Sequence, residues 1–229
     1  MNNTKPCMKI TLTDTKPSIF ESKIGGTGYI PHDGNFPTDS KGNQLRLLAQ
    51  IECGKIQLDG FMKTGLLQFW VLNDDVTGID WDDQTKQDGF RVIYYPEIDT
   101  TVTKEEIESK FVKNEFDDDD MFPVFRECGM SFEKSENEYV GEQELSDDDY
   151  DKIIGHKIGG YPYFTQNDPR EYIENGDSYD FLLFQLDTDS IDGEDVVMWG
   201  DAGVGNFFIN SERLKKQDFS DVLYNWDCC

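Results

Sequence analysis

Lys157-Ile158-Gly159-Gly160-Tyr161-Pro162-Tyr163-Phe164 begins with a lysine, an apolar residue and two glycines, and the same order occurs earlier in Lys23-Ile24-Gly25-Gly26-Thr27-Gly28-Tyr29-Ile30. Each copy is followed by a polar segment and then by a short apolar run that contains one glutamine. From Gly25 to Gln50 there are 25 positions, and from Gly159 to Gln185 there are 26. Two matched blocks at nearly equal spacing indicate an internal duplication.

Short apolar runs separated by glycine-rich and acidic turns predict a chain that consists mostly of strands. Few helices separate these runs, which favours antiparallel pairing over a doubly wound parallel sheet. We therefore predict a mainly β fold, α+β at the margin: an internally duplicated antiparallel β roll with a few short helices. The 229 residues are expected to form a single domain built from two repeats, about 23–100 and 157–229, which an acidic, partly helical segment, 101–156, joins.

Four segments have apolar residues at helical spacing. Thr103 begins a capping box, which predicts a helix from there to about residue 114. Shorter helices are predicted over residues 146–155 and 210–216, because each segment starts with a good capping residue. The tail, residues 219–226, also has helical spacing and is expected to pack on the body of the protein.

The charge of the chain is strongly negative, with 47 acidic and 21 basic residues and a formal net charge of −26. This argues against binding to the phosphate backbone of nucleic acids and against docking on an anionic membrane. If the acidity serves recognition, the partner is a basic protein; otherwise it serves solubility alone. Four acidic runs could gather on one face: Asp74-Asp75, Asp80 to Asp83, Asp117 to Asp120 and Asp147 to Asp149. We interpret the run from Asp117 to Asp120 as a solvated loop.

The five cysteines are scattered and form no CxxC pair, so we predict free thiols, no metal site and no cofactor. No apolar run reaches membrane-spanning length, and the N-terminus lacks the apolar segment of a signal peptide. A cytoplasmic location is therefore expected.

A catalytic group of residues is not recognisable. His32 and His156 are the only histidines, and neither stands beside a recognisable nucleophile and its third partner. We expect His32 in a loop and His156 at a helix C-terminus. The segment from Asp187 to Asp195 is similar to a calcium loop, but its twelfth position is Met198, where a bidentate glutamate is needed. An acidic hairpin turn explains it better.

Gln50 and Gln185 interrupt apolar strands at matching places, and a buried amide must satisfy up to four hydrogen bonds. Each glutamine could tie its strand to a glycine-rich turn, or the two could line a groove as pseudosymmetric polar groups. At least one of the paired glycines is expected to have positive φ. The candidate binding residues are Gly25, Gly26, Gln50, Gly159, Gly160, Gln185, Trp199, Asp201 and Asn206.

From about Lys23 to its end, the chain resembles the YwqG-like family of bacterial proteins of unknown function. The resemblance rests on residues 157–163, 48–51, 65–69, 199–203 with 206–209, and 225–228. Thr27-Gly28 departs from the pattern, because a residue and a proline are usual there. The resemblance implies a duplicated, roll-like β fold and distant kinship with programmed-cell-death-protein relatives that escort a ribosomal protein. The zinc-binding cysteines of some of those relatives are missing. Some bacterial relatives occur near secreted-toxin systems, which implies an immunity role.

Two functions from different classes remain. The leading hypothesis is a non-catalytic, cytoplasmic protein-binding module, chaperone-like or immunity-like toward a basic protein. The alternative is an enzyme of unassigned reaction, for example a hydrolase that uses carboxylates between the two repeats. A deep pocket with convergent carboxylates would favour the enzyme, and a broad acidic or apolar groove would favour the binding module.

Overall fold

The computed structural model describes residues 4–118, 121–138 and 152–228. Its main feature is one ten-stranded sheet in the order β12-β11-β8-β7-β1-β6-β2-β3-β4-β5, in which every neighbouring pair is antiparallel. The predicted mainly β, antiparallel fold is confirmed. The strands are β1 (Thr4–Thr13), β2 (Lys23–Ile24), β3 (Arg46–Glu52), β4 (Leu66–Val71), β5 (Phe90–Tyr95), β6 (Cys128–Glu138), β7 (His156–Gly159), β8 (Phe181–Asp187), β11 (Val204–Ile209) and β12 (Val222–Asp227).

The sheet is built symmetrically around the long central pair of β1 and β6. From β6 the order runs outward through β2, β3, β4 and β5, which we call the first repeat. From β1 it runs outward through β7, β8, β11 and β12, the second repeat. Both repeats carry an irregularity at the same place, since the register shifts between Leu47 and Ala49 in β3 and between Leu182 and Phe184 in β8. The two arms of the sheet thus share one strand order and one bulge.

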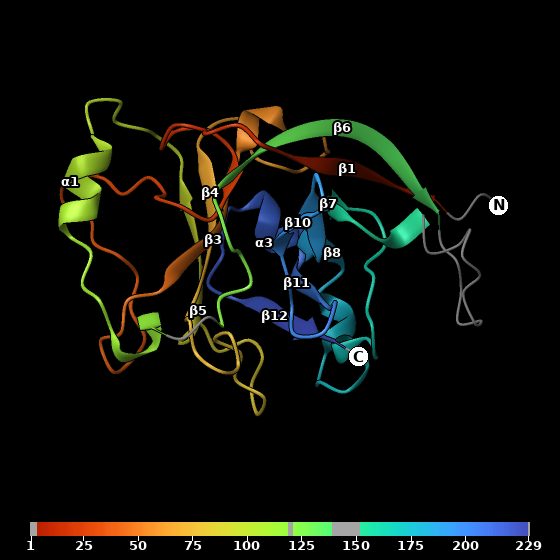
Figure 1. The fold of residues 1–229 in the computed structure, drawn as a ribbon. Helices are drawn as coiled ribbons and strands as arrows, with labels where there is room; N and C mark the ends of the chain where they lie inside the picture. The colour runs from red at the N-terminus through yellow and green to blue at the C-terminus, as the bar shows by residue number, and fades with distance from the viewer. Residues whose placement is uncertain (1–3, 119–120, 139–151, 229) are drawn as a thin grey trace.

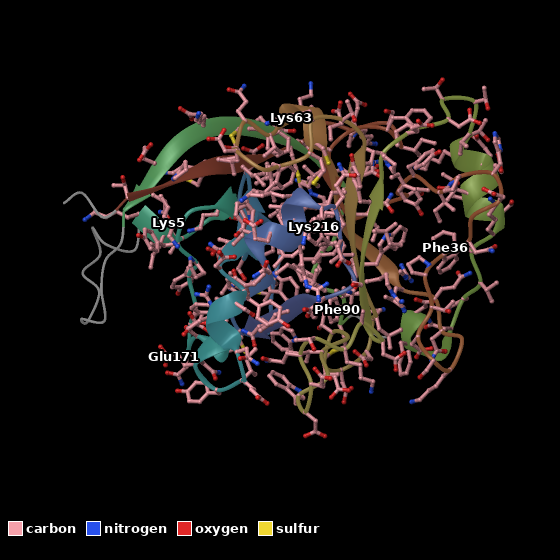
Figure 2. The ribbon with its side chains drawn as sticks, turned by 180° about the vertical axis from the view of Figure 1, so that it is seen from behind. Lys5, Phe36, Lys63, Phe90, Glu171 and Lys216 are labelled. Carbon is pink, nitrogen blue, oxygen red and sulfur yellow. The ribbon has the colours of Figure 1, made fainter. Side chains whose placement is uncertain are left out.

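The sheet curls so that its two arms face each other beneath the β1–β6 pair (Figure 1). Aromatic rings from the two arms meet in the core: the centroids of Phe69 and Phe184 are 4.8 Å apart, and those of Phe90 and Tyr224 are 5.1 Å apart. Figure 2 shows Phe90 in the space between the arms. Apolar burial between the arms is therefore what closes the roll.

The outer face of each arm is also buried, which explains why all six residues of β4 are buried. Successive side chains of a strand point to opposite faces, so the neighbours of Phe69 in β4 point away from the core. On the outer face of the first repeat, Trp70 and Leu47 belong to a separate apolar cluster. On the second, Leu182 and Phe208 belong to another. Loops and short helices cover both clusters.

Two predicted helices are present, and the predicted helix of the tail is not. Helix α1 (Lys104–Ser109) begins after Thr103, whose side chain accepts a hydrogen bond from the Glu106 N–H, but it ends before residue 114. Helix α3 (Ser211–Lys215) begins after Asn210. The helix predicted for the tail is wrong, because residues 222–227 form β12. Its apolar spacing fits a strand equally well, with Val222 and Tyr224 facing the core.

The remaining elements are short. A hairpin of β9 (Asp189–Ile191) and β10 (Glu194–Val197) confirms the acidic turn, and residues 196–197 belong to it rather than to the main sheet. The 3₁₀ turns are η1 (Cys53–Lys55), η2 (Glu115–Asp118), η3 (Pro169–Glu171) and η4 (Gly176–Ser178). Most of the helix predicted over 146–155 lies outside the described residues. Within the described part of the chain, no helix has the length and hydropathy to cross a membrane.

Candidate functional site

The paired glycines form a left-handed turn in each repeat. Gly25, Gly26, Gly159 and Gly160 have φ values of +61°, +67°, +72° and +76°, so the predicted positive φ is confirmed at all four. The turns are also crowded, since a Cβ atom at Gly160 would lie 2.8 Å from Asn137. Glycine is needed here for the path of the backbone.

Gln50 is completely satisfied by four hydrogen bonds to residues of the N-terminal half of the chain. Its Oε1 accepts hydrogen bonds from the Tyr29 N–H and from Nε2 of Gln68, both at 2.8 Å. Its Nε2 donates to the carbonyl oxygens of Ile19 and Glu21, both at 2.9 Å. These four bonds use every donor and acceptor position of the amide, so Gln50 fastens the segments on both sides of the glycine turn to β3.

Gln185 makes the equivalent contacts in the second repeat. Its Oε1 accepts from the Tyr163 N–H at 2.8 Å, and its Nε2 donates to the carbonyls of Ile153 and Gly155 at 3.1 and 2.7 Å. These partners stand 134 positions after their counterparts at Tyr29, Ile19 and Glu21. The contacts support the tying role, and ligand binding by the two glutamines stays a prediction.

The lysine that opens each glycine block is buried beside the glutamine, a feature that the sequence interpretation missed. Lys23 donates to the carbonyls of Pro17 and Thr27 and pairs with Glu127 at 2.8 Å. Lys157 donates to the carbonyl of Ile153. Burial lowers the pKa of both lysines, that of Lys157 to about 7. The signal was present, since each lysine precedes an apolar residue of a short strand.

The three other candidate residues lie in or near β11 of the second repeat and serve different purposes. Asn206 is buried opposite Gln185 and donates from Nδ2 to the Tyr163 carbonyl at 2.9 Å. Trp199 is buried and stacks on Trp226 with a centroid distance of 6.0 Å. Asp201 is exposed. The structure therefore brings Asn206 to the glycine turn of its own repeat.

A surface around Trp81 stands out, because this large apolar side chain is 60% exposed. Trp81 lies between two hollows, and we call the whole the Trp81 surface. The first hollow has a volume of about 330 Å³ and its lining includes Asp74, Asp80, Asp82 and Asp88. The second, of about 400 Å³, is lined by Trp81, Tyr172, Trp226, Asp227 and other polar residues.

The carboxylates of the first hollow differ in their surroundings. Asp80 pairs with Lys86 at 2.8 Å, which lowers the pKa of Asp80. Burial raises the pKa of Asp74, whose Oδ1 accepts the Gly78 N–H. Asp82 is exposed and directly follows Trp81 in the sequence. The hollow therefore combines negative charge with an open aromatic face.

The second hollow is held together by the C-terminal strand. Asp227 accepts hydrogen bonds from the N–H groups of Thr165 and Gln166, both at 3.1 Å, and burial raises its pKa. The indole of Trp226 donates to the Val76 carbonyl at 2.8 Å, and its ring lies 6.4 Å from that of Trp81. The second hollow thus lies between the end of β12 and the acidic loop that carries Trp81.

The structure places the four acidic runs of the sequence in different surroundings. Asp74, Asp80 and Asp82 line one hollow, as the gathering of acidic runs predicted for this part. The solvated-loop interpretation is wrong for Asp117, whose side chain is only 1% exposed and which pairs with Arg46 at 2.6 Å. A charged partner on β3 buries this carboxylate, which the local sequence cannot reveal. Residues 119–120 and 147–149 lie outside the described residues.

Both histidines contact carboxylates of the protein, and three of the described cysteines are buried. His32 lies in a loop, as expected, and its Nδ1 is 2.9 Å from Glu106. His156 is in β7 rather than at a helix end; its Nδ1 accepts from the Asp187 N–H at 3.0 Å, and its Nε2 is 3.1 Å from Asp189. Among the described cysteines, Cys7, Cys53, Cys128 and Cys228 are free. Burial raises the pKa of the Cys53 thiol to about 12, which makes it unreactive.

Comparison with known proteins places the chain in a family. Residues 22–228 match a domain of unknown function (DUF1963), and because the match covers nearly the whole chain, the protein belongs to this family. No curated protein matches the chain. The matched range includes both repeats and both hollows of the Trp81 surface.

Proposed function

We propose that this DUF1963 protein is a non-catalytic protein-binding module that captures a basic protein through the Trp81 surface. The observation that carries the proposal is the exposure of Trp81, 60%, at the rim of a hollow lined by carboxylates. Tyr172, which lines the other hollow, is 71% exposed. Tryptophan and tyrosine are the residue types that most often supply binding energy at protein interfaces.

The chemistry of the surface fits a lysine- or arginine-rich segment. A cationic side chain over the face of an exposed indole gains a cation–π interaction, which is strongest for tryptophan. The carboxylates around it attract positive charge, and the net charge of −26 extends this attraction over the molecule. Electrostatic attraction of this kind accelerates association and gives it a steep dependence on salt.

The biological setting is proposed from the resemblance described above. Kinship with YwqG-like proteins supports a cytoplasmic protein that is chaperone-like or immunity-like toward its basic partner. Either role needs tight, reversible binding and no reaction at the site. The acidic hollow and its aromatic rim supply both attraction and contact area.

The experiment captures partners from an extract with the wild-type chain and measures their association at low and high ionic strength. Trp81→Ala is expected to weaken binding by about tenfold or more, as an aromatic anchor does. Asp82→Asn is expected to lower the association rate and the salt dependence. The matched control is Val112→Ala, because Val112 is an exposed apolar residue, 65%, that lines neither hollow. Capture of a basic protein that Trp81→Ala retains at full affinity would contradict the proposal.

A further inference from the structure

A cavity of about 300 Å³ opens on the outer face of the first repeat, and its lining residues differ from those of the Trp81 surface. Its deepest lining residues are Leu47 of β3 and Trp70 of β4, both buried. Phe36, Phe111 and Phe122 form the more open walls. Figure 2 shows Phe36 on the outer side of this arm, next to the segment that carries α1. The volume is at the lower end of the range for small-molecule sites.

In each repeat, the segment that follows the glycine turn covers the aromatic ring on the outer face of the sheet. Strand pairing matches Leu47 and Trp70 with Leu182 and Phe208. The Phe208 ring is covered by the Arg170 guanidinium, 4.4 Å from the ring centroid, and by Phe164, stacked at 6.0 Å. In the first repeat, Phe36 covers Trp70 with ring centroids 5.8 Å apart, and the cavity lies beside this contact. Planar groups therefore cover the outer ring in both repeats.

The aromatic walls of the cavity contact one another, and the Arg46 guanidinium lies 5.2 Å from the centroid of the Phe111 ring. Phe36 meets Trp70 edge to face, with centroids 5.8 Å apart, and meets Phe111 in the same manner at 5.7 Å. Edge-to-face and offset contacts with a further ring are the geometries that aromatic groups prefer. Four aromatic side chains around so small a space favour a planar aromatic ligand.

The charged groups at the cavity have partners of opposite charge, which favours a ligand without net charge: Arg46 pairs with Asp117, and Glu108 lies 3.7 Å from Lys104. Arg46 donates from Nε and Nη2 to the buried Asp117 at 2.8 and 2.6 Å, and this pair is neutral. Its Nη1 has no hydrogen bond among the described residues and can donate to a ligand. Glu108, on α1, accepts the Thr27 hydroxyl at 2.9 Å and has a second oxygen that can accept from a ligand. One donor and one acceptor thus face an aromatic space.

We propose that this cavity binds a neutral, planar heteroaromatic small molecule of nucleobase size. The ring packs among the aromatic side chains that line the cavity, Phe36, Trp70, Phe111 and Phe122. A ring acceptor receives a hydrogen bond from Arg46, and a ring N–H or amino group donates to Glu108. This site is separate from the proposed protein-binding function and does not depend on it.

The test is saturation-transfer NMR, followed by titration, with adenine as the probe. Benzoate, benzamidine and cyclohexanol serve as anionic, cationic and non-planar comparisons. Adenine is expected to bind with a dissociation constant of roughly 1 mM or below, the range for a ligand of its size. The three comparison compounds are expected to bind at least about tenfold more weakly, because each lacks either planarity, neutrality or the paired donor and acceptor.

Glu108→Ala is expected to weaken adenine binding about tenfold, since a hydrogen bond to a charged acceptor is lost. Glu105→Ala is the matched control, because Glu105 is also an exposed glutamate of α1 but does not line the cavity. Trp81→Ala is expected to leave adenine binding unchanged, which separates this site from the protein-binding surface. Absence of adenine binding at 10-fold above the expected constant, equal binding of benzamidine, or unchanged affinity in Glu108→Ala would each overturn the proposal.

Discussion

Replacing Gln50 by leucine is the most direct test of how the glycine turns are held. Leucine has a similar volume but leaves the N–H of Tyr29, the carbonyls of Ile19 and Glu21, and one N–H of Gln68 without their partner. Each unsatisfied buried group costs about 1–3 kcal/mol. For four groups the loss is therefore on the order of 4–12 kcal/mol, similar to the whole stability of a typical domain.

The assay is urea unfolding followed by circular dichroism, with Gln57→Leu as the control because Gln57 is exposed. The control is expected to change the free energy of unfolding by less than about 0.5 kcal/mol. Gln185→Leu should be slightly milder than Gln50→Leu, since Gln185 loses three hydrogen bonds to the described residues rather than four. A cost below about 1 kcal/mol for Gln50→Leu would refute the view that this amide fastens the turn.

Three further perturbations test other parts of the fold by the same unfolding measurement. Gly65→Ala should lower the free energy of unfolding by at least about 1 kcal/mol more than Gly42→Ala. Both glycines have positive φ, but only at Gly65 would a Cβ atom lie 2.2 Å from a carbonyl oxygen, that of Tyr95. Equal losses in the two variants would rule out the steric argument. Trp70→Phe should cost about 1–3 kcal/mol because it leaves a buried glutamine oxygen without the indole N–H, and a cost no greater than for an exposed residue would contradict this. Lys157 has a folded pKa of about 7, so between pH 7 and 10 only the unfolded chain holds its proton, and the stability contributed by this group rises with pH. Lys157→Met should therefore stabilise the protein most below pH 7, and this gain in the free energy of unfolding should fall by roughly 1.4 kcal/mol per pH unit above pH 7. A constant difference between the variant and the wild type from pH 6 to 10 would reject the depressed pKa.

The duplication and the strand class could be predicted because both are written in local spacing. Gly25 and Gly159 mark turns that only glycine adopts easily, and the glutamines stand at matching distances after them. The tail could not be assigned in the same way. Apolar residues at 219, 222, 223 and 226 fit a helix and a strand equally well, and pairing with β11 decides between them. Tertiary context overrides local pattern here.

The candidate site was partly hidden for a different reason. Trp81 stands inside an acidic run, and its exposure depends on how the loop leaves the sheet. The aromatic residue between acids was a usable signal, because a tryptophan in a solvated loop is unusual. The burial of Asp117 was not predictable, since its partner Arg46 is 71 positions away.

The two repeats differ where their contacts allow it. On the inner face, Phe69 and Phe184 pack against each other across the roll, so a change in one arm must be matched in the other. On the outer face each arm is covered by its own loops, and no such matching is needed. Trp70 and Phe208 occupy equivalent positions there; Phe36 covers Trp70 beside a cavity, and Arg170 covers Phe208. A duplicated roll of this kind can therefore acquire a binding site on the outer face of one repeat while the core between the arms stays closed. The sequence differences that matter for function are then expected in the loops over the outer face.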